Sequence, residues 1–201
     1  PEHHSESTEA LLAHIPGLRL VIPSSPKRAY GLLLAALRSP DPVVFLEPKR
    51  IYRAVKHRVD DSGQALPLDR CFTLRVGQDL TLVTWGALVQ EAQQAAKQLH
   101  TEGIDVEVID VATLQPLDMD TIITSVTKTG RVLIAHEAVQ SFGAGAEIAA
   151  QLAEHAQPQL KAPIKRLGGY STVMPLLQNE HYYLLSSDDI AQAARDLMLQ
   201  G

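Results

Sequence analysis

The stretch Arg131–His155 constrains the fold most strongly, because it joins a short apolar run to an apolar helical pattern. Val132–Ala135 is a continuous apolar run, which is typical of a strand buried on both faces of a parallel sheet. We expect this strand to stop at His136–Glu137, before a short loop that contains Gly143 and Gly145. Strand, glycine loop and helix in this order predict a βα unit of an open α/β sheet. The helical spacing is carried by Ala146, Ile148, Ala149, Leu152 and Ala153.

The same alternation of strands and helices fills most of the chain. Residues 5–47 predict helix, strand, helix and strand, with Ser7 and Ser25 as the N-caps of the two helices. From Asp79 onward, further βα units predict a mostly parallel sheet with right-handed crossovers, whose strand order is not visible in the sequence. Between these regions the chain is polar and predicts a long connection with at most one short strand. The later strands are expected at Leu80–Thr84, Val106–Val111 and Ile164–Leu167.

Composition excludes several classes of protein. The 201 residues carry 18 basic and 23 acidic side chains, a formal charge of −5, which argues against a nucleic-acid-binding surface. No apolar run is long enough to cross a membrane. The single cysteine, Cys71, excludes an internal disulfide, fits a reducing compartment and is expected to be a small buried hydrophobe. The first third is the most basic, which indicates either solvated charge, the favoured interpretation, or a docking face for a partner subunit.

No complete catalytic motif is present: the sequence has no Walker phosphate loop, GxSxG, HExxH or paired cysteines. The amides of Gly143–Gly145 could hold an anion at a helix N-terminus, but a tight approach to a neighbouring helix or subunit is favoured. His136 and Glu137, at a strand end, could act as a functional pair or as a hydrogen-bonded interface pair. His3 and His4 precede a helix, where a loop histidine can transfer protons near neutral pH.

Several motifs taken together resemble the β subunit of the E1 component of 2-oxo acid dehydrogenase complexes. In the first half these are HSES at 4–7, HIPGL at 14–18, VIPS at 21–24, GLL at 31–33, DPVVFLE at 41–47 and IYR at 51–53. In the second half they are TWG at 84–86, IDV at 109–111, LQPLD at 114–118, KTGR at 128–131 and HEA at 136–138. The resemblance covers essentially the whole chain.

This resemblance implies an α/β fold in which residues 1–53 are the C-terminal part of a pyrimidine-binding, thiamine-type domain. Residues 54–76 would be a linker, and residues 77–201 a transketolase C-terminal-like, mostly parallel three-layer αβα domain. It also implies an α2β2 heterotetramer with an E1 α subunit and a second β subunit, in the bacterial cytoplasm or the mitochondrial matrix. Such enzymes use thiamine diphosphate and Mg²⁺ to decarboxylate pyruvate or a branched-chain 2-oxo acid, and they pass the acyl group to lipoyl-E2.

Two sets of residues carry over from the family. His4 takes the place of the active-site histidine, which assists reductive acylation of the lipoyl group. The backbone carbonyls of Ala36, Ser39 and Asp41 take the place of a structural K⁺ site. The resemblance places no cofactor-binding residue in this sequence. The family's activating glutamate lies upstream of the histidine motif, so we expect the chain to be a fragment without decarboxylase activity, even with an α subunit.

Two alternatives stay open. The chain could come from another transketolase-like enzyme, although such enzymes lack this combination of motifs. It could also serve, as an isolated fragment, as a non-catalytic module for subunit association and E2 docking.

Overall fold

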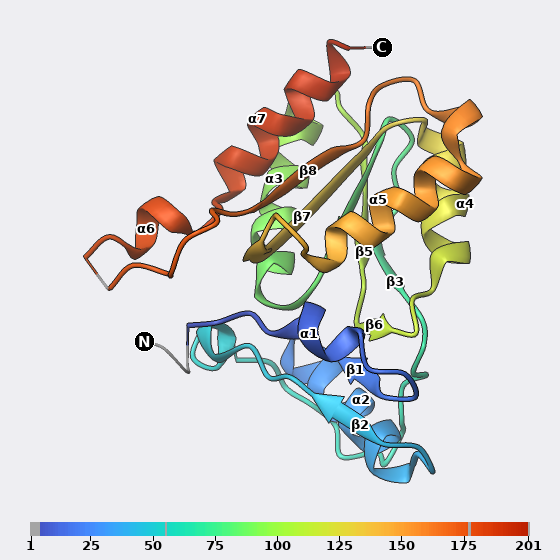
Figure 1. Cartoon of the computed structure of the whole chain (residues 1–201), viewed down its shortest axis with the longest axis vertical. Coiled ribbons are helices and arrows are strands. Elements are labelled where there is room, and N and C mark those ends of the chain that lie inside the picture. Colours follow the sequence, from blue (N-terminus) through green and yellow to red (C-terminus); the bar gives the residue numbers. More distant parts are fainter. Residues whose placement is uncertain (1–4, 55, 177, 201) are drawn as a thin grey trace.

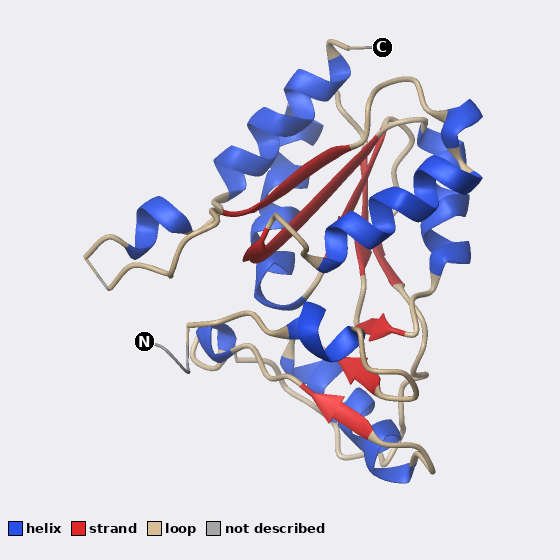
Figure 2. Cartoon of the chain, viewed as in Figure 1, coloured by secondary structure: helices blue, strands red, loops and turns tan. Residues whose placement is uncertain are grey.

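The computed structural model describes residues 5–54, 56–176 and 178–200. The chain forms a larger C-terminal part built on a five-stranded sheet, and a smaller N-terminal part that lies against one end of that sheet (Figure 1). Both parts alternate strands with helices, so the expected α/β class is confirmed (Figure 2). Within the described ranges, no helix is long and apolar enough to cross a membrane.

The larger sheet has the strand order β3-β5-β4-β7-β8. All neighbouring strands are parallel except β3, which runs antiparallel to β5 at one edge. Strands β4 and β5 are buried along their whole length, as expected of strands covered on both faces. The strands are β3 (Phe72–Arg75), β4 (Leu80–Thr84), β5 (Val106–Asp110), β7 (Val132–Val139) and β8 (Lys165–Gly169).

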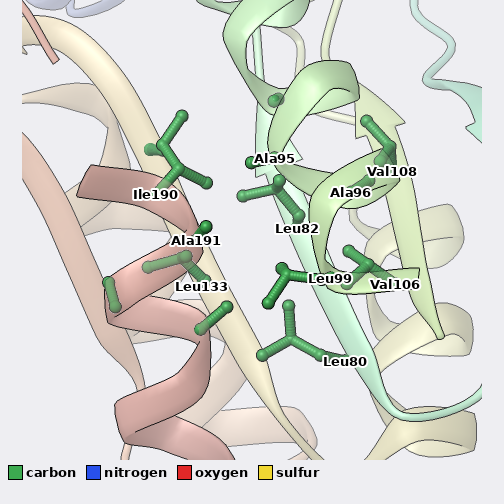
Figure 3. Close-up of a cluster of buried hydrophobic side chains, with 14 of the residues drawn as sticks. Leu80, Leu82, Ala95, Ala96, Leu99, Val106, Val108, Leu133, Ile190 and Ala191 are labelled. Carbon is green, nitrogen blue, oxygen red and sulfur yellow. The ribbon is translucent and has the colours of Figure 1, made fainter. Parts of the chain in front are cut away.

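Helices cover both faces of this sheet and give it three layers. On one face α3 (Val89–Thr101) and α7 (Ser187–Met198) pack over Leu80, Leu82 and Leu133 (Figure 3). On the other face, α4 (Met119–Thr129) and α5 (Ala144–His155) pack over a second apolar cluster. The short elements are η2 (Gly86–Leu88), η3 (Gln157–Gln159) and α6 (Glu180–Tyr183), the last of which lies in a segment that projects from the body (Figure 1).

The N-terminal part is built on a sheet of order β2-β1-β6. Its third strand, β6 (Thr113–Gln115), comes from the C-terminal half of the sequence and pairs antiparallel with β1. The sequence patterns did not predict β6, because three residues are too few for a recognisable period. The other elements of this part are α1 (Glu9–Ala13), β1 (Arg19–Val21), α2 (Pro26–Arg38), β2 (Val43–Phe45) and η1 (Lys49–Ile51).

Most of the predicted helix boundaries are confirmed by their caps. The Ser25 side chain accepts from the backbone N–H of Arg28 at 3.3 Å, and Asp118 caps α4 in the same way. Gly130 ends α4 with a left-handed φ of 75°, a conformation that glycine adopts without steric cost. Ser7 is a correction: α1 begins after Thr8, whose side chain makes no capping hydrogen bond.

Strand β7 corrects a second prediction, because it does not stop at His136. It continues to Val139, which pairs with Gly169 of β8 after a register shift that follows Ala135. Within this extension His136 is buried while Glu137 is partly exposed, so the strand changes from a continuous apolar run to an alternating pattern. As a result Gly143 is the N-cap of α5, and Gly145 lies in the first turn of the helix instead of a loop.

Candidate functional site

The carboxyl ends of the parallel strands of the larger sheet face the N-terminal part (Figure 1). In open α/β sheets, ligands and partners usually bind at this edge. Side chains at the carboxyl ends of β4, β5 and β7 meet side chains of α1, α2 and η1 there, in three groups. We define this region as the interdomain edge and take it as the candidate functional site.

The first group is built on Trp85, which follows directly after β4 and is 4% exposed. Its indole N–H donates a hydrogen bond of 3.2 Å to the carboxylate of Glu9 in the first turn of α1. Its ring stacks on the imidazole of His136, with centroids 5.0 Å apart and planes 15° from parallel. Burial raises the pKa of Glu9, and the hydrogen bond from Trp85 partly offsets this. Trp85 therefore connects the start of α1 to two central strands of the larger sheet.

His136 is fully buried, and this burial lowers its pKa to about 4. The imidazole is therefore neutral near pH 7. Its Nδ1 lies 3.0 Å from the carbonyl oxygen of Ala138, so the neutral ring carries its proton on Nδ1 and donates it to that carbonyl. The buried ring, stacked on Trp85, contributes to the packing at this end of the sheet. His136 and Glu137 do not form the hydrogen-bonded pair considered from the sequence, because His136 bonds to the Ala138 carbonyl and Glu137 pairs with Arg50.

Two glycines leave space for this imidazole. A Cβ on Gly145 would lie 2.7 Å from the His136 ring, and one on Gly143 would lie 2.6 Å from the carbonyl oxygen of Val139. Contacts this short are sterically forbidden, so glycine is required by the close approach of α5 to β7. The glycine pair thus serves close packing against strand β7 of the same chain, whereas the sequence favoured a neighbouring helix or subunit.

The second group is an ion-pair network centred on Arg50 of η1. Its guanidinium lies 2.8 Å from the Glu137 carboxylate and 2.6 Å from that of Glu91 in α3. Burial raises the pKa of Glu137, and the Arg50 charge lowers it again. Because Arg50 belongs to the N-terminal part and both carboxylates belong to the C-terminal part, this network holds the two parts together. Glu137 therefore pairs with Arg50 across the interface.

The third group is centred on Asp110, the last residue of β5, which is fully buried. Ser24 donates a hydrogen bond of 2.5 Å to its Oδ2, and the Nε of Arg28 lies 3.9 Å from the same oxygen. Its Oδ1 has no hydrogen-bond partner within residues 5–54, 56–176 and 178–200, nor has Oγ1 of Thr84, its neighbour in register on β4. Burial raises the pKa of Asp110 to about 6. This carboxyl group is the most strongly perturbed acid at the interdomain edge.

The other predicted site residues lie elsewhere. His4, the proposed active-site histidine, and His3 fall outside the described residues. Cys71 is only partly buried, beside the second apolar cluster, and so is less buried than the sequence predicted; burial and nearby carboxylates raise the pKa of its thiol. The described part of the chain contains no group of three or more His, Cys, Asp or Glu side chains that could hold a metal ion.

The predicted K⁺ site lies at the C-terminal end of α2. The carbonyl of Ala36 already accepts a hydrogen bond from the N–H of Ser39 at 3.2 Å. The Arg19 guanidinium contacts Ser39 Oγ and pairs with the carboxylate of Asp41. A guanidinium beside the loop opposes a second cation, so the residues in this arrangement fit K⁺ poorly. K⁺ binding by Ala36, Ser39 and Asp41 stays a prediction. Equal unfolding midpoints in KCl and NaCl would contradict it.

Sequence reasoning missed Glu9, Trp85, Arg50 and Asp110 as members of one region. Asp110 could have been found, because a carboxylate at the carboxyl end of a buried strand is the same signal that singled out His136. Trp85 follows another such strand and was noted only as part of a motif. Glu9 gave no such signal, because an acidic residue in a first helical turn is ordinarily explained by the helix dipole.

Comparison with known families assigns both parts of the chain. The transketolase C-terminal domain family matches residues 70–190, and the transketolase pyrimidine binding domain family matches residues 1–55. These two assignments agree with the fold class expected from the sequence.

The chain is also similar to curated proteins over nearly its whole length. It is 45% identical over 196 residues to the pyruvate dehydrogenase E1 component subunit beta of Acholeplasma laidlawii, covering 98% of this chain and 60% of the relative. It is 42% identical over 195 residues to the subunit of the same name from Staphylococcus epidermidis, covering 97% and 60%. The chain therefore spans about 60% of the length of these relatives.

Solved structures give a consistent fold. A split gene transketolase, described as an inactive beta4 tetramer, superposes with a TM-score of 0.79 at 25% identity, covering 96% of this chain and 61% of that one. Transketolase from Leishmania mexicana superposes with a TM-score of 0.61 at 22% identity, covering 94% and 26%, and supports the fold alone.

Proposed function

Since the chain belongs to the transketolase C-terminal domain family, we propose that it functions as part of the β subunit of a 2-oxo acid dehydrogenase E1 enzyme. The observation that carries this proposal is the identity of 41–45% to pyruvate dehydrogenase E1 β subunits over 97–98% of the chain. Identity at this level is much higher than the 25% shared with the split gene transketolase. The pyrimidine binding domain match to residues 1–55 supports the same assignment.

The proposed reaction is the oxidative decarboxylation of pyruvate, followed by transfer of the acetyl group to lipoyl-E2. Thiamine diphosphate would supply the nucleophilic carbon for decarboxylation, and the resemblance places its diphosphate and Mg²⁺ on the α subunit. The described residues of this chain do not themselves form a site for Mg²⁺. The proposed assembly is a heterotetramer of two α and two β subunits, with the division of this chain at residues 54–76.

Within this proposal His4 is the proton donor for acyl transfer. When the lipoyl disulfide opens, the leaving sulfur needs a proton, and imidazolium can donate it near neutral pH. His4 precedes α1 by a few residues, and α1 is attached to the larger sheet through Glu9 and Trp85. We therefore propose that the Trp85 group helps to position the segment that carries His4.

The test uses a heterotetramer assembled from the α subunit and a β subunit that also carries the activating glutamate upstream of this sequence. His4→Ala should lower reductive acetylation of a lipoyl domain by about 100-fold or more, because a general acid contributes on this scale. Pyruvate decarboxylation measured with an artificial electron acceptor should change only a few-fold. The matched control, His3→Ala, should leave both rates close to the wild type. Equal losses of the two activities, or no loss in His4→Ala, would contradict the role of His4.

Pyruvate is favoured over branched-chain 2-oxo acids because the curated relatives carry pyruvate dehydrogenase names. Parallel assays with pyruvate and 2-oxoisovalerate give the preference directly, as a ratio of kcat/KM values. A higher kcat/KM for 2-oxoisovalerate would move the assignment to the branched-chain enzyme.

A non-catalytic role in subunit association is the second candidate. It is supported by large apolar side chains that are exposed around the projecting α6 segment and the loop before α5: Phe142, Tyr170, Val173, Leu176 and Tyr182. Exposed apolar groups that cluster in this way often mark protein–protein contacts. Pull-down with E1 α and E2 separates the two roles, because binding without turnover of pyruvate would favour the association module. Turnover of a ketose phosphate instead of pyruvate would favour a transketolase-like enzyme.

A further inference from the structure

An open cavity of about 630 Å³ lies between α2 of the N-terminal part and α3 of the C-terminal part. It shares no lining residue with the Trp85 group or with the Arg50 network, but it adjoins the Asp110 group, because Ser24 and Arg28 line it. Its size falls within the range of small-molecule sites in proteins. Nothing in the proposed dehydrogenase reaction uses it.

The cavity concentrates positive charge in a protein that is acidic overall. Lys27, Arg28 and Lys97 line it together with His57, and no aspartate or glutamate is among the lining residues. The chain as a whole has a formal charge of −5. A lining with three basic side chains and no acidic one therefore differs from the average composition of the protein. A cleft lined by one sign of charge raises the local concentration of ligands of the opposite sign.

Arg28 has donors available for such a ligand. Its guanidinium lies 3.6 Å from the centroid of the Phe72 ring, which supports its flat face. Within the described part of the chain, the nearest carboxylate oxygen is Oδ2 of Asp110 at 3.9 Å from Nε, too far for a hydrogen bond. The orientation is therefore fixed by stacking, while the N–H groups are left without a protein hydrogen bond among the described residues. A fixed guanidinium suits bidentate binding of a phosphate.

The remaining lining fits a larger ligand that carries such a group. Ser25 caps the N-terminus of α2, where the helix dipole adds positive potential. Gln90, Gln93 and Gln94 of α3 present amide donors and acceptors, while Leu74 and Val89 add apolar surface. We propose that this cavity binds a small molecule bearing a phosphate or diphosphate group, held by Arg28, Lys27 and Lys97.

The test is calorimetric titration of the 201-residue chain with inorganic pyrophosphate at low ionic strength. We expect binding that weakens as salt is added, because the contacts are between charges. Lys27→Ala/Lys97→Ala should weaken binding by about tenfold or more, since it removes two charge-assisted contacts. Both lysines are exposed, so the double variant should keep the wild-type circular dichroism spectrum and unfolding midpoint.

The matched control is Lys49→Ala/Lys165→Ala, which removes the same charge from two exposed lysines outside the cavity. It should change the affinity by less than about twofold. Titrations with AMP and with ribose 5-phosphate in parallel identify whether a nucleotide or a sugar phosphate is preferred. Absence of binding up to about 10 mM pyrophosphate, or equal losses in the two double variants, would overturn the proposal. These results do not depend on dehydrogenase activity.

Discussion

Trp85 donates its indole N–H to the carboxylate of Glu9 at 3.2 Å, a contact between residues 76 positions apart that joins the two parts of the chain. Both side chains are almost fully buried. A buried carboxyl with few donors is costly to ionise, so the hydrogen bond from Trp85 matters for the stability of the interdomain edge. It also attaches α1, which begins soon after His4, to the larger sheet.

Replacing the donor tests this contact. Trp85→Phe keeps an aromatic ring for His136 but removes the N–H, so the pKa of Glu9 should rise further. We expect a loss of about 1–3 kcal/mol in the free energy of unfolding, measured by urea denaturation. Because a raised folded-state pKa costs stability as pH increases, the loss should be larger at pH 8 than at pH 4. In Glu9→Gln the same Trp85→Phe change should cost less, and an equal cost in both backgrounds would exclude the coupling.

A second prediction concerns the space that Gly145 leaves for His136. Gly145→Ala places a Cβ 2.7 Å from the imidazole, so helix α5 or the ring must move. Overpacking of this kind typically costs about 1–3 kcal/mol, measurable as a lower unfolding midpoint. In a His136→Ala background, Gly145→Ala should lower the unfolding midpoint by less than it does in the wild type, because the ring that the Cβ would overlap is gone. Additive effects of the two changes would show that the overlap with His136 is not the cause.

Asp110 gives a prediction about stability between pH 4 and pH 7. Its pKa is raised from the ordinary value of 3.8 to about 6 by burial, so the folded state holds this proton more tightly than the unfolded state. The group therefore stabilises fully below about pH 4, and this contribution is lost as pH rises to about 6. Asp110→Asn lacks this titration. The free energy of unfolding of the variant, relative to that of the wild type, should therefore rise by about 3 kcal/mol between pH 4 and pH 7.

Urea denaturation at several pH values measures this shift. Asp69→Asn provides a control, because Asp69 is partly exposed and paired with Arg19. Parallel pH profiles for the wild type and Asp110→Asn would show that Asp110 does not carry the raised pKa.

His136 gives the opposite dependence at acid pH. Its pKa is lowered from 6.5 to about 4 by burial, so the unfolded state binds a proton first as pH falls. The wild type should therefore lose up to about 3 kcal/mol between pH 6.5 and pH 4 from this residue. His136→Asn is less stable at neutral pH because the Trp85 stack is lost, but its stability should fall less over this range. His155→Asn, at an exposed residue, should keep the wild-type profile.

Local patterns in the sequence predicted the elements of the larger sheet well. Leu80–Thr84 is a strand with the expected bounds, and Asp118 and Gly130 delimit α4 as expected. These features depend on neighbouring residues, so a sequence window contains the information. The extension of β7 to Val139 was missed, because it depends on pairing with Gly169 of a later strand.

The interdomain edge was less predictable for a related reason. Glu9, Trp85 and His136 are distant in the sequence, and only the packing of the N-terminal part against the strand ends brings them together. The perturbed pKa values of Glu9 and Asp110 likewise follow from burial at this contact and not from their neighbours in the sequence. Motif resemblance identified the family, whereas the chemistry of this edge required the three-dimensional arrangement.

Strand β6 has a consequence for how the molecule would respond to cleavage. It belongs to the C-terminal half of the sequence but pairs with β1, so the smaller sheet contains strands from both halves of the polypeptide. A protease that nicks the polar connection near Gly63 would cut the backbone without freeing either half. The nicked protein should elute as a single peak in size-exclusion chromatography. It should give two bands only in denaturing gel electrophoresis. The connection is therefore not needed to keep the two parts together, because the pairing of β6 with β1 does so.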